Sequence, residues 1–125
     1  MLATSRLKVA YAIIYLARSE CAGCCVVDVV YRLQGVEFEW DDQKSRLNII
    51  NHGVTFEEAA EVFFDPFYQY GDATPNDVNE QRNFVLGYSV AQRLLLVVYT
   101  ERRERTRIIS ARLATRAERK LYESA

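Results

Sequence analysis

Arginine is concentrated near the C-terminus in a way that suits the binding of phosphate. Residues 100–125 carry eight cationic side chains, of which seven are arginine. The guanidinium group is a planar, permanently charged fork that matches two phosphate oxygens. It can also stabilise the negative charge that develops on a phosphate during cleavage. The eight residues are Arg102, Arg103, Arg105, Arg107, Arg112, Arg116, Arg119 and Lys120.

The alternation of side chains predicts how two pairs of residues in this region are arranged. We expect a strand over residues 106–111, on which Arg105 and Arg107 share one face. Ser110 and Arg112 would then share the opposite face. The alternative interpretation is that these arginines are solvated charges that form surface ion pairs.

Two side chains are candidates for proton transfer. A turn at residues 102–104 would place Glu101 near the strand that carries Arg107, and so bring a carboxylate beside guanidinium groups. His52 is the only histidine, and imidazole titrates near neutrality without perturbation. It could act as an acid or base in catalysis, or it could cap the end of a helix.

Aromatic side chains offer surfaces on which bases could stack. Trp40 and Tyr99 suit the hydrophobic core better than a binding surface. The sequence has no glycine loop for phosphate and no acidic set spaced for a metal, since helix capping explains Asp41-Asp42. We therefore expect no metal and no cofactor. The remaining candidates for stacking are Tyr68, Tyr70, Tyr88 and Tyr122.

Signals for secondary structure begin clearly at residue 37. Glu37 to Trp40 alternates polar and apolar residues, as a half-buried strand does. A helix over residues 43–51 follows, begun by Asp41 or Asp42 and ended by Gly53. Three apolar residues lie near one face of this helix, namely Leu47, Ile49 and Ile50.

A capping box predicts a second helix, with Thr55 at its start and Glu58 three residues later. This helix would run through Phe64 and stop at Asp65-Pro66. The residues expected to face inward are Phe56, Ala59, Ala60 and Phe63.

Strands and a last helix complete the expected fold. A short strand at residues 67–70 is possible, and strands are expected at 83–88, 94–100 and 106–111. A capping box formed by Thr115 and Glu118 opens a helix that ends near Glu123. Short links favour an antiparallel meander, with helices packed on one face. The predicted class is therefore a compact α+β domain.

Charge is distributed unevenly along the 125 residues. The formal net charge is −1. Residues 36–99 carry four basic and eleven acidic side chains, whereas residues 100–125 carry eight basic and four acidic ones. This distribution indicates a local anion site rather than general attraction to a polyanion. The three cysteines, Cys21, Cys24 and Cys25, are interpreted as reduced thiols of a cytoplasmic protein.

The first 35 residues differ from the rest, so we divide the chain into an extension, 1–35, and a domain, 36–125. Three interpretations of the extension stay open. It could add a helix or strand to the domain, or it could be an export signal with its apolar run at Val9 to Ala17. It could also be upstream sequence joined by a misplaced start, because Val36 can be encoded by a GTG start codon.

Short motifs follow one another from residue 36 to residue 123, and in this order they resemble the BrnT family of bacterial toxins. The early motifs are Trp40-Asp41, Lys44, Asn48, His52-Gly53-Val54 and Ala59-Ala60-Glu61-Val62-Phe63. The later ones are Arg82 to Gly87, Thr100-Glu101-Arg102, Arg107-Ile108-Ile109-Ser110-Ala111-Arg112 and Ala114-Thr115. Two departures stand out: Leu113 replaces a residue that is usually basic, and residues 1–35 have no counterpart.

The resemblance implies a RelE-like fold, cleavage of RNA without a metal, and growth arrest through blocked translation. It also implies a BrnA-like antitoxin with a ribbon-helix-helix domain, and contact with operator DNA only through that antitoxin. In the expected mechanism the ribose 2′-OH attacks the phosphate, and Glu101 or His52 accepts the proton. Arg102, Arg107 and Arg112 would stabilise the transition state. Further RNA contacts are expected from Arg82, Lys44, Arg116 and Arg119.

A second hypothesis belongs to a different class. The chain could be a binding module without catalysis, either a decayed toxin that still binds its antitoxin or a regulator that binds nucleic acid.

Overall fold

Seven strands and three helices lie within the part of the chain that the structure describes. The structure is a computed structural model, and it describes residues 13–18, 27–77 and 79–125. The predicted α+β class is confirmed. The strands are β1 (Ile13–Arg18), β2 (Val27–Leu33), β3 (Val36–Asp41), β4 (Gln69–Asp72), β5 (Asn83–Tyr88), β6 (Leu94–Arg102) and β7 (Arg105–Leu113). The helices are α2 (Asp42–His52), α3 (Phe56–Val62) and α4 (Arg116–Ser124).

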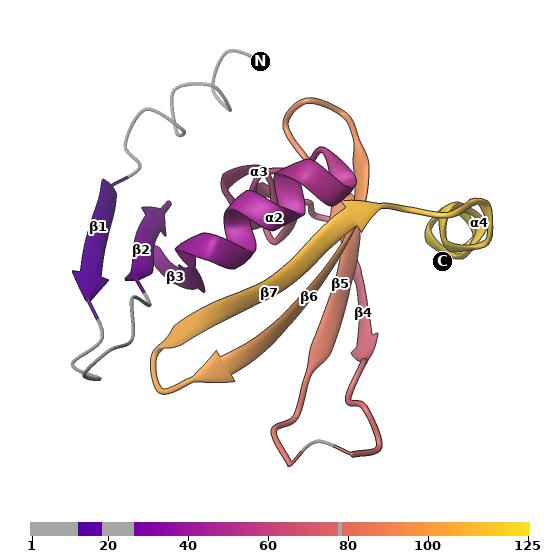
Figure 1. Cartoon of the computed structure of the whole chain (residues 1–125). Helices are drawn as coiled ribbons and strands as arrows, with labels where there is room; N and C mark the ends of the chain where they lie inside the picture. The colour runs from indigo at the N-terminus through magenta and orange to yellow at the C-terminus, as the bar shows by residue number, and fades with distance from the viewer. Residues whose placement is uncertain (1–12, 19–26, 78) are drawn as a thin grey trace.

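All of these strands belong to one sheet, in the order β1-β2-β3-β7-β6-β5-β4 (Figure 1). Strands β4 to β7 form an antiparallel meander, because each pairs with the next along the chain. Strand β3 joins this meander by parallel pairing with β7, at Phe38↔Thr106 and Glu39↔Arg107. The chain therefore passes through two helices and three strands before β7 returns beside β3.

The boundary near residue 35 coincides with a tight turn between β2 and β3. Gln34 and Gly35 have φ values of 52° and 82°, and two positive φ angles are what a type I′ hairpin turn requires. Strand β2 then contributes Val29, Tyr31 and Leu33 to the same core as β3. The described part of the extension thus adds strands to the sheet. A natural start at Val36 stays a prediction, and the three cysteines lie outside the described residues.

Helix α2 has the expected ends but a different inner face. Asp41 is its N-cap and accepts a hydrogen bond from the backbone N–H of Gln43, while Gly53 (φ 67°) is its left-handed C-cap. The buried residues of α2 are the polar Ser45 and Asn48. The apolar residues singled out in the sequence point outward instead, because the helix packs through small and amide side chains. Leu47, Ile49 and Ile50 are 48%, 45% and 77% exposed.

Helix α3 begins as predicted and ends early. The hydroxyl of Thr55 accepts a hydrogen bond from the backbone N–H of Glu58, and Phe56, Ala59 and Ala60 are fully buried. Regular helix stops at Val62 rather than Phe64. The residues that follow form tighter turns. The N–H of Phe64 donates to the carbonyl of Glu61, and the N–H of Asp65 donates to the carbonyl of Val62.

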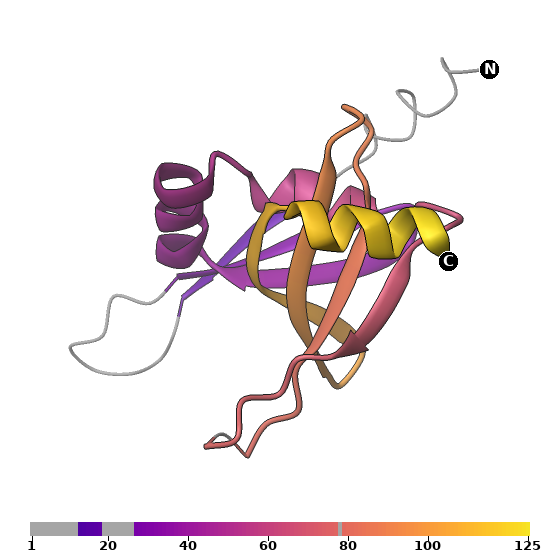
Figure 2. The same cartoon turned by 90° about the vertical axis from the view of Figure 1, so that its right-hand side faces the viewer.

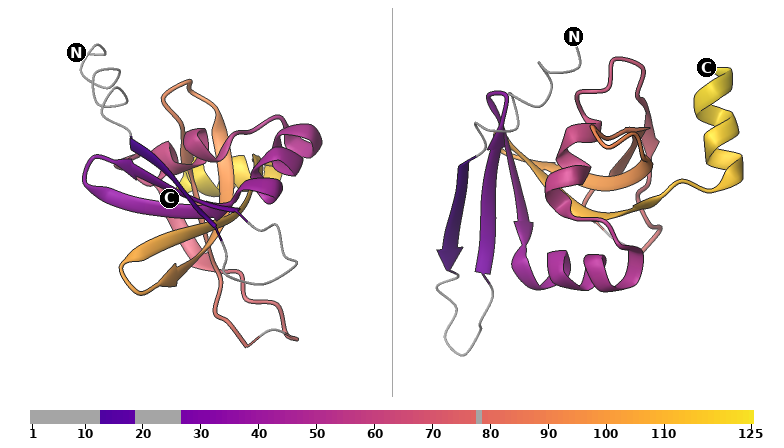
Figure 3. Two further views of the ribbon diagram at one scale, coloured as in Figure 1. Left: turned by 60° about the vertical axis from the view of Figure 1, so that its left-hand side comes forward. Right: turned by 90° about the horizontal axis from the view of Figure 1, so that it is seen from above.

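The hydrophobic core lies between the sheet and the pair α2 and α3 (Figures 1 and 3). Trp40 packs edge-on against Phe56, and Phe38 packs against Phe63. Helix α4 stands apart from this core at the end of β7, and none of its residues is buried (Figure 3). The loop between β4 and β5 extends beyond the sheet (Figure 2). None of the described helices is long and apolar enough to cross a membrane.

Candidate nucleic-acid interface

A register shift in β7 decides which face of the sheet its arginines occupy. Val98 pairs with Ser110, but its neighbour Tyr99 pairs with Ile108, so Ile109 is an extra residue on β7. Such a bulge reverses the alternation of side chains along a strand. Four β7 residues consequently lie opposite even-numbered residues of β6 and share one face. The pairs are Arg102↔Arg105, Thr100↔Arg107, Val98↔Ser110 and Leu96↔Arg112.

We call this surface the arginine face. The prediction that Arg107 and Arg112 lie on opposite faces was wrong, because alternation alone takes no account of a bulge. The helices α2 and α3 cover the other face, since Val97, Ile108 and Ala111 belong to the core that they enclose.

Carboxylates hold three arginines at the hairpin end of the arginine face. Arg102 Nε donates to Glu80 at 2.9 Å, and Arg105 Nε donates to Glu37 at 3.0 Å. Arg107 donates to Glu39 at 2.8 Å and to Asp28 at 3.3 Å, and only 16% of its side chain is exposed. Burial disfavours the charge of Arg107, but the two carboxylates outweigh burial and raise its pKa. At this end of the arginine face, the alternative interpretation of the sequence, that the arginines form ion pairs, agrees with the structure. The carboxylates involved are Asp28, Glu37, Glu39 and Glu80.

Arg82 differs from these arginines, because it forms no ion pair with any described residue. Its Nε is buried and has no hydrogen-bond partner there. The backbone of Arg82 is fixed by two hydrogen bonds with the hydroxyl of Thr74. A hydrogen bond from Arg102 lowers the pKa of Glu80, and the charges of Arg82 and Arg107 lower it further. Arg102 thus pairs with Glu80, whereas the buried Nε of Arg82 has no hydrogen-bond partner among the described residues.

Arg112 is held at the other end of the arginine face by helix α4. Its two terminal nitrogens donate to the two carboxylate oxygens of Glu118, each at 2.8 Å. This fork lowers the pKa of Glu118 to about 2. Glu118 also accepts from the backbone N–H of Thr115, which completes the predicted capping box. Sequence reasoning recognised only the capping role of Glu118.

Other contacts of α4 involve tyrosines. Arg119 donates to the Tyr88 hydroxyl at 3.1 Å, and the rings of Tyr88 and Tyr122 meet edge to face at 5.2 Å. The Tyr122 hydroxyl donates to Asp65 at 2.7 Å. Burial and the Asp65 hydrogen bond both raise the pKa of Tyr122. Arg116, at the start of α4, is exposed and forms no ion pair with described residues.

The two candidates for proton transfer lie at opposite ends of the sheet. Arg93, which precedes β6, donates to the carbonyl of Gly53 at 3.1 Å and so ties the neighbouring His52 to the start of β6. Glu101 lies near the end of this nine-residue strand. A strand rises about 3.3 Å per residue, so roughly 25 Å separates the two ends. His52 and Glu101 therefore cannot act on the same phosphate.

Glu101 also lies on the helix-bearing face rather than on the arginine face. It pairs with Thr106 across the hairpin, and its carboxylate accepts from the Thr106 hydroxyl at 3.0 Å. The expected placement of Glu101 beside guanidinium groups is thus not observed. Lys44 is likewise remote from the arginine face, since it lies exposed in the first turn of α2.

Asn48 is an important residue whose role the sequence did not reveal. Its side-chain amide donates to the carbonyls of Val54 (2.9 Å) and Ala111 (2.8 Å) and accepts from the N–H of Ala111 (3.1 Å). Strand β3 turns into α2 before it reaches Ala111, so the Asn48 amide supplies the groups that a neighbouring strand would offer. The segment from Asn48 to Val54 is therefore a structural motif.

The fold and the arginine face together define a small α+β domain with a row of arginines on the sheet face opposite α2 and α3. Residues 40–118 match the model of the ribonuclease toxin BrnT of type II toxin–antitoxin systems, and the chain belongs to this family. The resemblance seen in the sequence is thereby confirmed. A 1.1 Å crystal structure of the Brucella abortus ribonuclease toxin BrnT is similar at 21% identity and a TM-score of 0.48. The similarity covers 62% of this chain and 94% of that one. No curated protein matches the chain.

Proposed function

We propose that the chain is an endoribonuclease with a RelE-like fold that cleaves RNA on the arginine face without a metal. The β7 bulge is the observation that carries this proposal, because it gathers Arg107 and Arg112 on the same face as Arg102. In the cytoplasm, cleavage would block translation and arrest growth. The type II family implies an antitoxin partner, and we propose a BrnA-like ribbon-helix-helix protein that also provides the contact with operator DNA.

The chemistry needs stabilisation of a phosphate that gains negative charge after attack by the ribose 2′-OH. Arg82 is available for this task, because no described carboxylate neutralises it. Arg107 and Arg112 would exchange their carboxylate partners for phosphate oxygens, while Arg102, Arg116 and Arg119 would bind the RNA strand. Glu101 lies on the opposite, helix-bearing face, so we do not propose it as the proton acceptor for a reaction on the arginine face.

The test compares RNA cleavage by the full chain with that of two arginine variants. Removal of one transition-state donor typically costs on the order of 100-fold in rate, so we expect Arg82→Ala to lose about that much. Arg46→Ala is the matched control, because Arg46 lies on α2, away from the arginine face, and forms its ion pair with Asp42. Cleavage should persist in EDTA, and induction without antitoxin should stop growth. Equal cleavage by Arg82→Ala and the unchanged protein would exclude the arginine face.

The second candidate is a binding module without catalysis. It is favoured by the carboxylate partners of Arg102, Arg105, Arg107 and Arg112. Protein that binds RNA at the arginine face but never cuts it, with or without EDTA, would establish this alternative.

A further inference from the structure

One continuous segment of the chain is acidic throughout. Residues 55–81 contain seven carboxylates and neither lysine nor arginine. This segment forms α3, β4 and most of the loop that leads to β5. Two of the seven carboxylates are neutralised, Glu58 by Arg93 and Glu80 by Arg102. The other five form no ion pair with a described residue, so the segment carries an excess of negative charge.

Strand β4 lies at one end of the sheet order and pairs only with β5 among the described strands. Its outer edge consequently offers backbone N–H and C=O groups to a further strand. Side chains next to this edge are aromatic and unusually exposed, and we call them the aromatic patch. They are Phe67 (72% exposed), Tyr68 (43%) and Tyr70 (73%).

The aromatic patch is held together by a ring contact, and a carboxylate lies next to it. Tyr68 and Tyr70 meet edge to face, with ring centres 6.0 Å apart. Burial raises the pKa of Tyr99, and Glu101, Tyr68 and Tyr70 lie close enough to contribute. Asp65 accepts the backbone N–H of Phe67 at 2.9 Å. The patch is thus apolar in its rings, and Asp65 lies at its margin.

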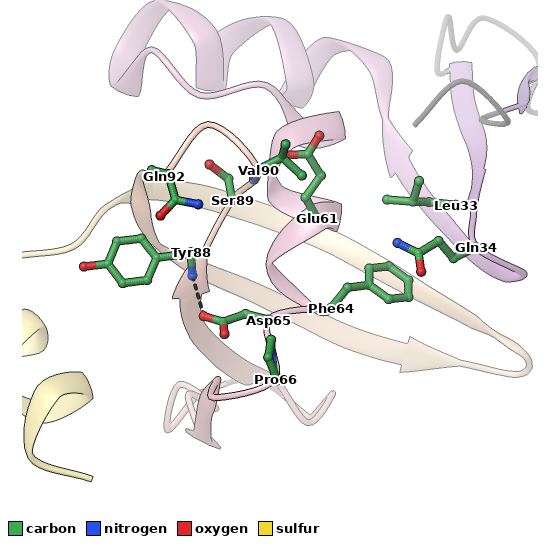
Figure 4. A pocket seen from close by; sticks show the side chains of 10 residues that line it. All are labelled: Leu33, Gln34, Glu61, Phe64, Asp65, Pro66, Tyr88, Ser89, Val90 and Gln92. Carbon is green, nitrogen blue, oxygen red and sulfur yellow. Dashed lines mark hydrogen bonds between the residues drawn. The ribbon is translucent and has the colours of Figure 1, made fainter. Parts of the chain in front are cut away.

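A pocket of about 310 Å³ opens beside the patch, and Pro66 forms part of its wall (Figure 4). Among the described residues that line it, the charged ones are Glu61 and Asp65. Glu61 accepts the backbone N–H of Val90 at 3.0 Å, yet burial raises its pKa. A cationic group in the pocket would favour the ionised form of Glu61. The pocket therefore has the charge and, at about 310 Å³, the volume to take a basic side chain.

We propose that the β4 edge and the aromatic patch bind an extended segment of a protein partner in which basic and apolar side chains alternate. The segment would add a strand to the sheet beside β4. One of its basic side chains would enter the pocket at Glu61. The antitoxin that this toxin family implies is the source of the segment, so the proposal rests on the proposed partner but not on the proposed cleavage.

Charge favours a basic polypeptide over the two other partners that could bind an exposed aromatic strand edge, namely RNA and a second copy of the chain. RNA phosphates would be repelled by the carboxylates of residues 55–81. A second copy of the chain would bring the same acidic segment against itself across a two-fold interface, which places like charges together. Only a cationic polypeptide complements both the charge and the unpaired strand edge.

The test uses the full chain and two pools of labelled nonapeptides. In one pool Lys or Arg alternates with Val, Leu or Phe, and in the other Glu replaces each basic residue. Fluorescence anisotropy should show binding of the basic pool alone. Phe67→Ser and Tyr70→Ser should each weaken this binding at least tenfold, as should Glu61→Gln. Ile50→Ser is the matched control, because Ile50 is 77% exposed on α2.

Hydrogen exchange gives a second measurement, since the basic pool should protect the β4 amides that face away from β5. The proposal is overturned if the basic pool fails to bind, or binds the patch variants as well as the unchanged protein. It is also overturned if these variants instead lose RNA binding or a concentration-dependent dimer. Phe67→Ser should keep full RNA cleavage, and Arg82→Ala should keep peptide binding, so the two proposals fail independently.

Discussion

Arg112 and Glu118 face each other through two parallel hydrogen bonds of 2.8 Å, which join β7, the last strand along the chain, to helix α4. The geometry is the one in which a guanidinium would bind a phosphate, with a carboxylate in the place of the phosphate oxygens. Glu118 therefore has two roles. It completes the capping box at the start of α4, and it pairs with Arg112, a candidate ligand for phosphate. Its state of ionisation couples the stability of the fold to the availability of Arg112.

Acid should weaken the attachment of α4. Glu118 has a pKa of about 2 in the folded protein, below the ordinary value of 4.5. Its contribution to stability is therefore present above pH 4.5 and is lost as the pH falls toward 2. We expect Glu118→Gln to lower the free energy of unfolding by about 1 kcal/mol at pH 7 and by less near pH 2.

Urea unfolding at both pH values measures this effect. Glu123→Gln, on the same helix and without an ion pair among described residues, is the control. A Glu118→Gln penalty that is the same at both pH values would contradict the assignment.

RNA binding should respond in opposite directions to changes at the two partners. Glu118→Gln frees the Arg112 guanidinium and removes a negative charge, so we expect tighter binding of single-stranded RNA. Arg112→Ala removes a phosphate ligand and should weaken it. The salt dependence of affinity should also fall in Arg112→Ala, because fewer counterions are released.

Filter binding at several salt concentrations separates these outcomes, again with Glu123→Gln as the charge-matched control. If Glu118→Gln gains no more affinity than this control, Glu118 does not compete with phosphate at Arg112.

Loss of the Asn48 amide should destabilise the whole domain. Asn48→Ala would leave the N–H of Ala111 and two carbonyls without their buried partners, at a cost of about 3 kcal/mol. Asn51→Ala, at an exposed position of the same helix, should change stability by less than about 0.5 kcal/mol. Thermal and urea unfolding provide the comparison, and equal stability of the two variants would refute the structural role.

His52→Ala should leave RNA cleavage nearly unchanged. His52 ends α2 beside Gly53, which Arg93 links to the start of β6, and roughly 25 Å separates that end of β6 from the hairpin that carries Arg102. The rate of cleavage as a function of pH should keep the same shape in this variant. A His52→Ala variant that loses cleavage would instead make His52 the proton acceptor and move the active site to that end of the sheet.

Local sequence signals predicted much of the fold because they depend on neighbouring residues. Thr115 and Glu118 form their capping box, and Gly53 ends α2 in the left-handed conformation, as the residue types require. Such local signals could not predict which side chains of α2 are buried. One of its buried side chains, Asn48, forms hydrogen bonds with an open strand edge at Ala111. That residue lies 63 positions further along the chain.

The sequence by itself determined the family, the α+β class and the concentration of arginine near the C-terminus, since these follow from composition and the order of motifs. Only the tertiary structure decided which arginines share a face and which are neutralised. A single extra residue, Ile109, turns Arg107 toward the side of Arg112. Carboxylates from β2 and β3 reach Arg107 across the sheet, 79 and 68 residues away in sequence. Pairing register and long-range ion pairs are properties of the assembled sheet, so no local pattern contains them.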